Sequence, residues 1–172
     1  MRHAKSSWAN LGQGDYERPL NARGENDAPR MGRWLSQQNK VPDLIVSSTA
    51  KRARQTAELL AENLDGFDRT CLEWADDLYH AAASVYLRKL DDLAHANNES
   101  IERVLFVGHN PGLEELLQKL SGEYHFMPTA TIAWFENLAR EPVETDIFQS
   151  IEPTLFRLQR VWRPKEILKD SL

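Results

Sequence analysis

The chain has 172 residues, of which 41% are hydrophobic and 27% are charged, and its formal net charge at pH 7 is -5. This length is ample for one domain with a real core and short for two. The acidic balance gives no sequence-wide attraction for nucleic acid or an anionic membrane, and no apolar run approaches the ~20 residues of a membrane span. We therefore expect a single cytosolic domain over residues 1–172, with neither nucleic acid nor a membrane as partner.

The N-terminal stretch Met1-Arg2-His3 places an arginine beside a histidine at the expected exit of a strand. The segment from Ala4 to Tyr16 is rich in small polar residues and has no regular period, which indicates a loop. Asn21 then offers an N-cap, and apolar residues recur at three- and four-residue spacing as far as Gln38. This pattern predicts an amphipathic helix.

The run Leu44-Ile45-Val46 is short and wholly apolar, as expected for a strand buried on both faces of a parallel sheet. A helix is expected from near Ala50, and its first turn carries Lys51, Arg52 and Arg54. Cations are disfavoured at a helix N-terminus because the backbone already presents positive partial charge there. A bound anion would compensate, which makes Arg52 a candidate ligand.

The middle of the chain alternates again between strand and helix patterns. Residues 70–74 are expected to form a short edge strand that includes Cys71, the only cysteine, so an internal disulfide is excluded. A helix is expected over 83–94, and the clearest buried strand of the chain over 104–107. The turn Gly108–Gly112 then leads into another helix.

Two further strands are expected in the C-terminal third, over 129–135 and 155–158, as an antiparallel extension of the sheet, with an acidic loop over 136–151. The alternation predicts an α/β fold, a three-layer sandwich with a mainly parallel central sheet. Ligands of such sheets bind at the carboxyl ends of the strands. The fold would therefore gather four segments at that edge: Arg2-His3, Ser47–Arg52, Asp77–Tyr79 and Gly108-His109.

These residues suit phosphoryl transfer, in which the protein's main task is to position the group and to stabilise its negative charge. Arg2 and Arg52 can each grip two phosphate oxygens with a permanently charged guanidinium fork. His3 is the candidate nucleophile, and His109 is a candidate donor at a helix N-terminus. No cofactor is required, because the arginines supply the positive charge. A zinc site on His3, His80 and His109 is an alternative, but clustered carboxylates are missing and the arginines would repel the ion.

Four motifs in chain order resemble the histidine phosphatase superfamily, specifically its SixA-like phosphohistidine phosphatase branch: Met1–Trp8, Arg18–Glu25, Ser47–Ala57 and Val107–Gly112. The resemblance extends as far as Phe135, and it implies the phosphoglycerate-mutase-like α/β sandwich. It also implies that His3 is phosphorylated and that His109 is the second histidine of the pocket. Arg2 and Arg52 would hold the phosphate.

The resemblance implies two further site residues and one departure. Arg18 matches an arginine of the branch and is expected to approach the pocket. Many relatives place a glutamate general acid where this chain has Asp76-Asp77, so Asp77 is the nearest candidate for that acid and for substrate contact, with a surface carboxylate as the alternative. Ala4 stands where the superfamily at large has glycine, a variation that suits the SixA-like branch.

Family members begin with an apolar central strand that ends in the Arg-His pair, whereas this chain starts at Met1. A central strand supplies hydrogen bonds on both edges and buries apolar surface on both faces. We therefore expect that the true start lies upstream, and that Met1 is an internal residue of that strand.

Three functions stay open at this point. The first is a metal-independent phosphatase that acts through His3 on phosphohistidine in a protein, which a compact sequence without a long lid insertion favours. The second is a phosphatase of small phosphomonoesters. The third is a phosphate-binding relative without catalytic activity.

Overall fold

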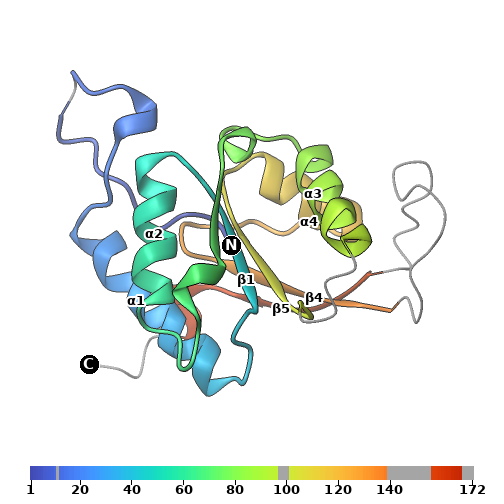
Figure 1. Cartoon of the computed structure of the whole chain (residues 1–172). Helices are drawn as coiled ribbons and strands as arrows, with labels where there is room; N and C mark the ends of the chain where they lie inside the picture. Colours follow the sequence, from blue (N-terminus) through green and yellow to red (C-terminus); the bar gives the residue numbers. More distant parts are fainter. Residues whose placement is uncertain (11, 97–100, 139–155, 168–172) are drawn as a thin grey trace.

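The computed structural model describes residues 1–10, 12–96, 101–138 and 156–167. Strands and helices alternate through most of this length, as the sequence pattern predicts (Figure 1). In chain order the elements, with η for 3-10 helices, are η1 (Asp15–Glu17), α1 (Ala22–Gln37), β1 (Leu44–Ser48), α2 (Lys51–Ala61), η2 (Arg69–Cys71), β2 (Leu72–Ala75), η3 (Asp76–Leu78), α3 (Ala83–His95), β3 (Val104–Val107), α4 (Gly112–Ser121), β4 (Ile132–Asn137), β5 (Phe156–Trp162) and α5 (Pro164–Ile167). Most of the expected loop at 136–151 lies outside the described residues. No described helix has the length and apolar character that spanning a bilayer demands.

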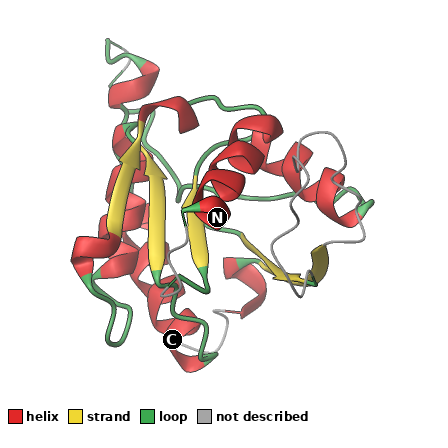
Figure 2. Cartoon of the chain, turned by 45° about the vertical axis from the view of Figure 1, so that its right-hand side comes forward, coloured by secondary structure: helices red, strands yellow, loops and turns green. Residues whose placement is uncertain are grey.

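Three strands form a parallel sheet in the order β2-β1-β3, with helices on both of its faces (Figure 2). β1 pairs with β2 through Ile45 opposite Leu72, and with β3 through Leu44 opposite Val104. The side chains of β1 alternate between two cores. Ile45 packs with residues of α1 and α2, whereas Leu44 and Val46 pack with residues of α3 and α4. The predicted three-layer α/β sandwich is confirmed, and β2 is the predicted edge strand.

Two helix starts show how local sequence prepares the site. α1 begins where the sequence indicates, because Oδ1 of Asn21 accepts a hydrogen bond from the amide of Gly24 at 3.0 Å. α2 begins without a side-chain cap, and Arg52 in its first turn is only 4% exposed. A buried guanidinium must be paired or hydrogen-bonded to offset its lost hydration. Its partners lie at the carboxyl edge of the sheet and are described below.

The C-terminal strands differ from the prediction. β4 and β5 pair antiparallel as expected, but they form a separate two-stranded sheet rather than an extension of the parallel one. The first residues of the chain lie between the two sheets. The amide of Arg2 donates to the carbonyl of Thr131, and the amide of Gly108 donates to the carbonyl of Met1, both at 3.0 Å. Residues 1–3 thus connect the two sheets through backbone hydrogen bonds.

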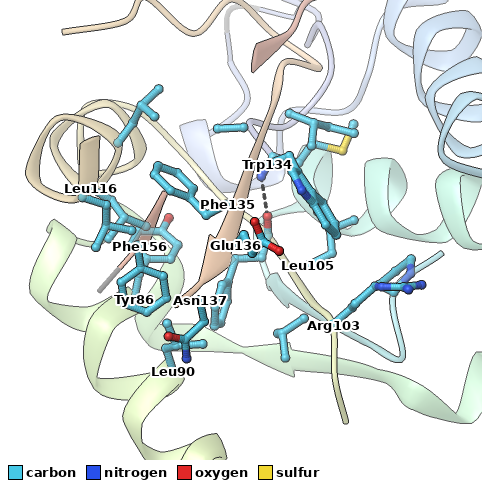
Figure 3. Close-up of a pocket in the computed structure, with 18 of the residues that line it drawn as sticks. Tyr86, Leu90, Arg103, Leu105, Leu116, Trp134, Phe135, Glu136, Asn137 and Phe156 are labelled. Carbon is cyan, nitrogen blue, oxygen red and sulfur yellow. Dashed lines mark hydrogen bonds between the residues drawn. The ribbon is translucent and has the colours of Figure 1, made fainter. Parts of the chain in front are cut away.

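β3 is less buried than its apolar sequence predicts. Val107 is fully buried, but Val104, Leu105 and Phe106 are only half-buried. A cavity of about 600 Å³ lies beside them, and Figure 3 shows Leu105 and Trp134 around it. The expectation that 104–107 is the clearest buried strand is therefore wrong for most of β3, whereas β1 is buried throughout. No described strand of the parallel sheet lies on the outer side of β3.

Candidate active site

The two histidines that the sequence places 106 positions apart meet at the carboxyl edge of the sheet, with ring centroids 5.0 Å apart. His3 follows the N-terminal stretch that pairs with Gly108, and His109 lies on the turn between β3 and α4. Both side chains are buried, at 7% and 2% exposure. The predicted convergence of His3 and His109 is therefore present in the structure.

Hydrogen bonds define which nitrogen of His3 is available. Its Nδ1 lies 2.7 Å from the carbonyl of Ala4, which can only accept, so Nδ1 carries the proton. Burial, the largest cause, together with the nearby charges of Arg52 and Arg2, lowers the pKa of His3 to about 3. The ring is thus neutral near pH 7, with a lone pair on Nε2. That lone pair accepts a hydrogen bond from Nε of Arg52 at 3.3 Å.

His109 is held from its other side by Ser48, whose Oγ lies 2.9 Å from Nε2. If that hydroxyl donates, the ring proton stays on Nδ1, which is buried and has no partner within the described part of the chain. Burial first, then His3 and Arg52, lowers the pKa of His109 to about 2. Nε of Arg2 is likewise buried without a described partner. Two orphaned donors beside the His3 nucleophile mark a place for an anion.

Arg52 and Arg18 both contact Asp15 on η1. Nη2 of Arg52 lies 2.9 Å from Oδ2 of Asp15, and Nη1 donates to its backbone carbonyl at 2.5 Å. Nη1 of Arg18 lies 2.6 Å from Oδ1 of the same carboxylate, and a second amino group contacts Oγ of Ser6. Arg18 also packs against the exposed ring of Trp8, with Cζ 3.4 Å from the ring centroid. Arg18 therefore approaches the pocket indirectly, because it contacts Asp15, which in turn contacts Arg52 beside His3.

Asp15, Tyr79 and His80 complete the rim. The sequence analysis expects Tyr79 at this edge and names His80 only for the zinc alternative, and it does not single out Asp15. Oδ2 of Asp15 accepts a hydrogen bond from Oη of Tyr79 at 2.9 Å and lies 3.5 Å from Nε2 of His80. Burial pushes the pKa of Asp15 up, but the hydrogen bond from Tyr79 and the guanidinium of Arg52 outweigh it and lower that pKa to about 2. The one sequence signal for Asp15 was its three-residue spacing from Arg18, which puts an acidic and a basic residue on one side of a helical turn.

Asp77 is not part of this cluster. It lies on η3 with its carboxylate 2.9 Å from Nζ of Lys89, and its side chain is 54% exposed. Successive side chains of a 3-10 helix differ by about 120°, so the turn that buries Leu78 directs Asp77 outward. The prediction that Asp77 contacts substrate has no support in this geometry, and the surface alternative describes it better.

Two glycines permit the close packing of these segments. A Cβ added to Gly108 would lie 2.0 Å from Oη of Tyr86, the hydroxyl that the amide of His109 approaches at 3.4 Å. A Cβ added to Gly112 would lie 1.8 Å from the carbonyl of Ala81. Without side chains at these positions, the start of α4 approaches the segment that carries His80.

The histidines do not form a metal site. His3, His80 and His109 do lie in one cluster, with the ring of His80 5.9 Å from that of His109. Among the residues that the structure describes, however, no three His, Cys, Asp or Glu side chains are placed to hold a metal ion together. The cluster also contains guanidinium groups, which favour an anion over a cation.

Comparisons with known proteins point to one family. A model of the histidine phosphatase superfamily (branch 1) matches residues 1–78. The chain is 34% identical over 125 residues to an uncharacterized protein of Mycobacterium tuberculosis, which covers 71% of this chain and 72% of that one. An uncharacterized chloroplast protein of Arabidopsis thaliana is 34% identical over 127 residues, covering 71% of this chain and 57% of the plant protein. A crystal structure of a candidate phosphohistidine phosphatase SixA from Agrobacterium tumefaciens has 29% identity and a TM-score of 0.74, with 95% of each chain covered.

Fold, site and relatives define one class of protein: the chain belongs to the histidine phosphatase superfamily. Within that superfamily it is SixA-like, as the four sequence motifs indicate. The chain spans less than two thirds of the Arabidopsis relative, at 57% of its length.

Proposed function

We propose that this protein is a metal-independent phosphatase that acts through a phosphohistidine intermediate on His3, and that its substrate is phosphohistidine in a protein. The observation that carries the proposal is the orientation of His3. Its Nδ1 is tied to the carbonyl of Ala4, and its Nε2 lone pair points to the guanidinium of Arg52. A neutral imidazole held in this way is a nucleophile that needs no base to activate it.

The surrounding donors support phosphoryl transfer. Arg52 and Arg2 supply positive charge, and Nδ1 of His109 supplies a neutral donor. In the first step Nε2 of His3 attacks phosphorus while the bond to the leaving atom breaks. In the second step the oxygen of water attacks phosphorus, the bond from phosphorus to Nε2 of His3 breaks, and phosphate is released. The guanidinium forks stabilise the charge on the phosphoryl oxygens in both steps.

Two observations favour a protein-bound phosphohistidine over a small phosphomonoester. The rim of the site carries two exposed rings, Trp8, which is 66% exposed, and His80, whose side chain is 56% exposed. An open rim admits a side chain that is attached to a large partner. The relative from Agrobacterium tumefaciens is also described as a candidate phosphohistidine phosphatase.

The test uses a labelled phosphodonor and two quenches. Wild type is incubated with a phosphorylated phosphocarrier domain, and the protein-bound label is measured after acid and after alkali. Acid-labile, alkali-stable label that disappears in His3→Ala and persists in the control His95→Ala is the expected result. His95 is exposed and pairs with Asp91 on α3, away from the cluster.

Each alternative has its own outcome. Turnover of sugar phosphates with no action on the phosphocarrier domain would favour a phosphatase of small phosphomonoesters. Binding of inorganic phosphate with neither label nor turnover would favour the non-catalytic relative. Circular dichroism of His3→Ala shows whether a lost label reflects chemistry or unfolding.

A further inference from the structure

His80 has a backbone conformation that side-chain-bearing residues rarely adopt. Its φ is +52°, in the left-handed region, and such strain is commonly retained where a side chain has a task. The ring packs on Tyr79 with centroids 4.2 Å apart and stacks on His109 at an interplanar angle of 29°. The strained backbone thus turns this imidazole towards His109 while more than half of the side chain stays exposed.

A carboxylate lies beside the ring of His80. Oδ2 of Asp15 lies 3.5 Å from Nε2 of His80, and the same oxygen accepts hydrogen bonds from Arg52 and Tyr79. A carboxylate beside an imidazole fixes the orientation of the ring for proton transfer. Asp15 therefore links the exposed histidine to the guanidinium that faces His3.

The other titratable groups of the cluster are poor proton donors. The lowered pKa values of His3 and His109 leave both rings without a second proton near neutral pH, and Asp15 is ionised for the same reason. Burial, with the Asp15 hydrogen bond, raises the pKa of Tyr79, whose hydroxyl already donates to that carboxylate. Glu114, the acid that faces Arg2, is engaged by the amide of Met127 at 2.8 Å.

We propose that His80 is the proton donor of this site and that Asp15 is its positioning residue, which rests on the proposed phosphoryl transfer to His3. As Nε2 of His3 bonds to phosphorus, the bond from phosphorus to the leaving atom breaks, and the proton of the His80 imidazolium moves to that atom. In the second step the oxygen of water bonds to phosphorus, and the bond from phosphorus to Nε2 breaks. The electron pair returns to His3, and the proton of the water moves to His80.

The need for this proton differs among leaving groups. A departing phosphohistidine ring can already carry a proton on its other nitrogen, and a nitrophenolate leaves without one. An alkoxide oxygen needs an acid at hand. His80 therefore extends the reactivity of the site to alkyl phosphate monoesters, as a second class of substrate.

The test compares His80→Asn with wild type on 4-nitrophenyl phosphate and on glycerol 2-phosphate. Because general acid catalysis contributes at least ~100-fold, kcat/KM should fall by about that factor for the glycerol ester and stay within about threefold for the nitrophenyl ester. Asparagine tolerates the left-handed backbone. His80→Gly is the second variant, because glycine adopts a positive φ without strain, and the same split is expected from it.

His95→Asn is the matched control. Its side chain is 57% exposed and lies 3.3 Å from a carboxylate, much as His80 does, but on α3. It should leave both kcat/KM values unchanged. Equal losses on the two esters, no loss in either His80 variant, or a wild type that cleaves only the nitrophenyl ester would each overturn the assignment of His80. The proposed function would instead be refuted, and the assignment with it, if wild type formed no label on His3 and did not act on the phosphocarrier domain or on either ester.

Discussion

Asp15 holds the guanidinium of Arg52 through two contacts, from its carboxylate at 2.9 Å and its backbone carbonyl at 2.5 Å. Its third nitrogen, Nε, donates a hydrogen bond to Nε2 of His3. Each nitrogen of this guanidinium therefore already has one partner within the chain. An incoming oxyanion meets a carboxylate that carries the same sign of charge beside the arginine that should hold it.

Replacing Asp15 should consequently strengthen oxyanion binding. Asp15→Asn keeps the shape of the side chain and removes its charge, so we expect inorganic phosphate to bind about tenfold more tightly, or ~1.4 kcal/mol. Isothermal titration calorimetry gives the dissociation constant. The control is Asp65→Asn, which removes an exposed carboxylate after the end of α2. Weaker binding by Asp15→Asn would mean that Asp15 assists the anion rather than competing with it.

The buried histidines predict a stability that falls in acid. Their pKa values are about 3 and 2 in the folded protein, below the ordinary 6.5, so the unfolded chain binds more protons below pH 6.5. The free energy of unfolding should then decrease from pH 6.5 towards pH 3, by at most ~1.4 kcal/mol per pH unit for each histidine. Urea unfolding of wild type and His3→Gln at pH 7, 6 and 5 measures this. A variant that loses stability as steeply as wild type would contradict it.

The cavity beside β3 predicts that an apolar extension before Met1 stabilises the fold. The carbonyl of Phe106 accepts a hydrogen bond from the amino group of Met1 at 2.7 Å, and burial lowers the pKa of that amino group to about 5. An extended segment of about five apolar residues, the usual strand length, would run along β3 and replace the buried amino group with an amide. Calorimetry should show a higher Tm than for a Gly-Ser extension of equal length. Equal Tm values would argue against a strand in this cavity.

The contact between Ser48 and His109 predicts that the hydroxyl selects the tautomer of the ring. Ser48→Ala removes the hydroxyl at 2.9 Å from Nε2 and leaves a buried nitrogen without a partner, a loss of ~1–3 kcal/mol. We expect a lower kcat, because the Nδ1 proton is no longer favoured over the alternative tautomer. Nitrogen NMR of His109 reports the tautomer directly. If both nitrogen shifts match those of wild type, the hydroxyl does not select it.

Much of the fold could be predicted from local sequence patterns. The cap at Asn21, the apolar run of β1 and the polar turn before α4 each depend on residues close in sequence, and each lies where the pattern predicts. The convergence of His3 and His109 also follows from topology, because parallel strands end at one edge. Prediction was limited where partners come from distant segments.

Asp15 shows that limit most clearly. Its loop has no period, and its contacts with Arg52 and Tyr79 join positions 37 and 64 residues apart. Asp77 shows the opposite error, because nearness in sequence to Tyr79 does not fix direction on a 3-10 turn. The half-buried state of β3 depends on its outer neighbour, which the composition of the strand itself does not specify.

The indole of Trp8 is 66% exposed and rests on the guanidinium of Arg18, which in turn grips Asp15. Whatever displaces that carboxylate also changes the charge next to the indole. The fluorescence of Trp8 should therefore change when an oxyanion binds in the pocket. The Trp8→Phe variant should lack this change.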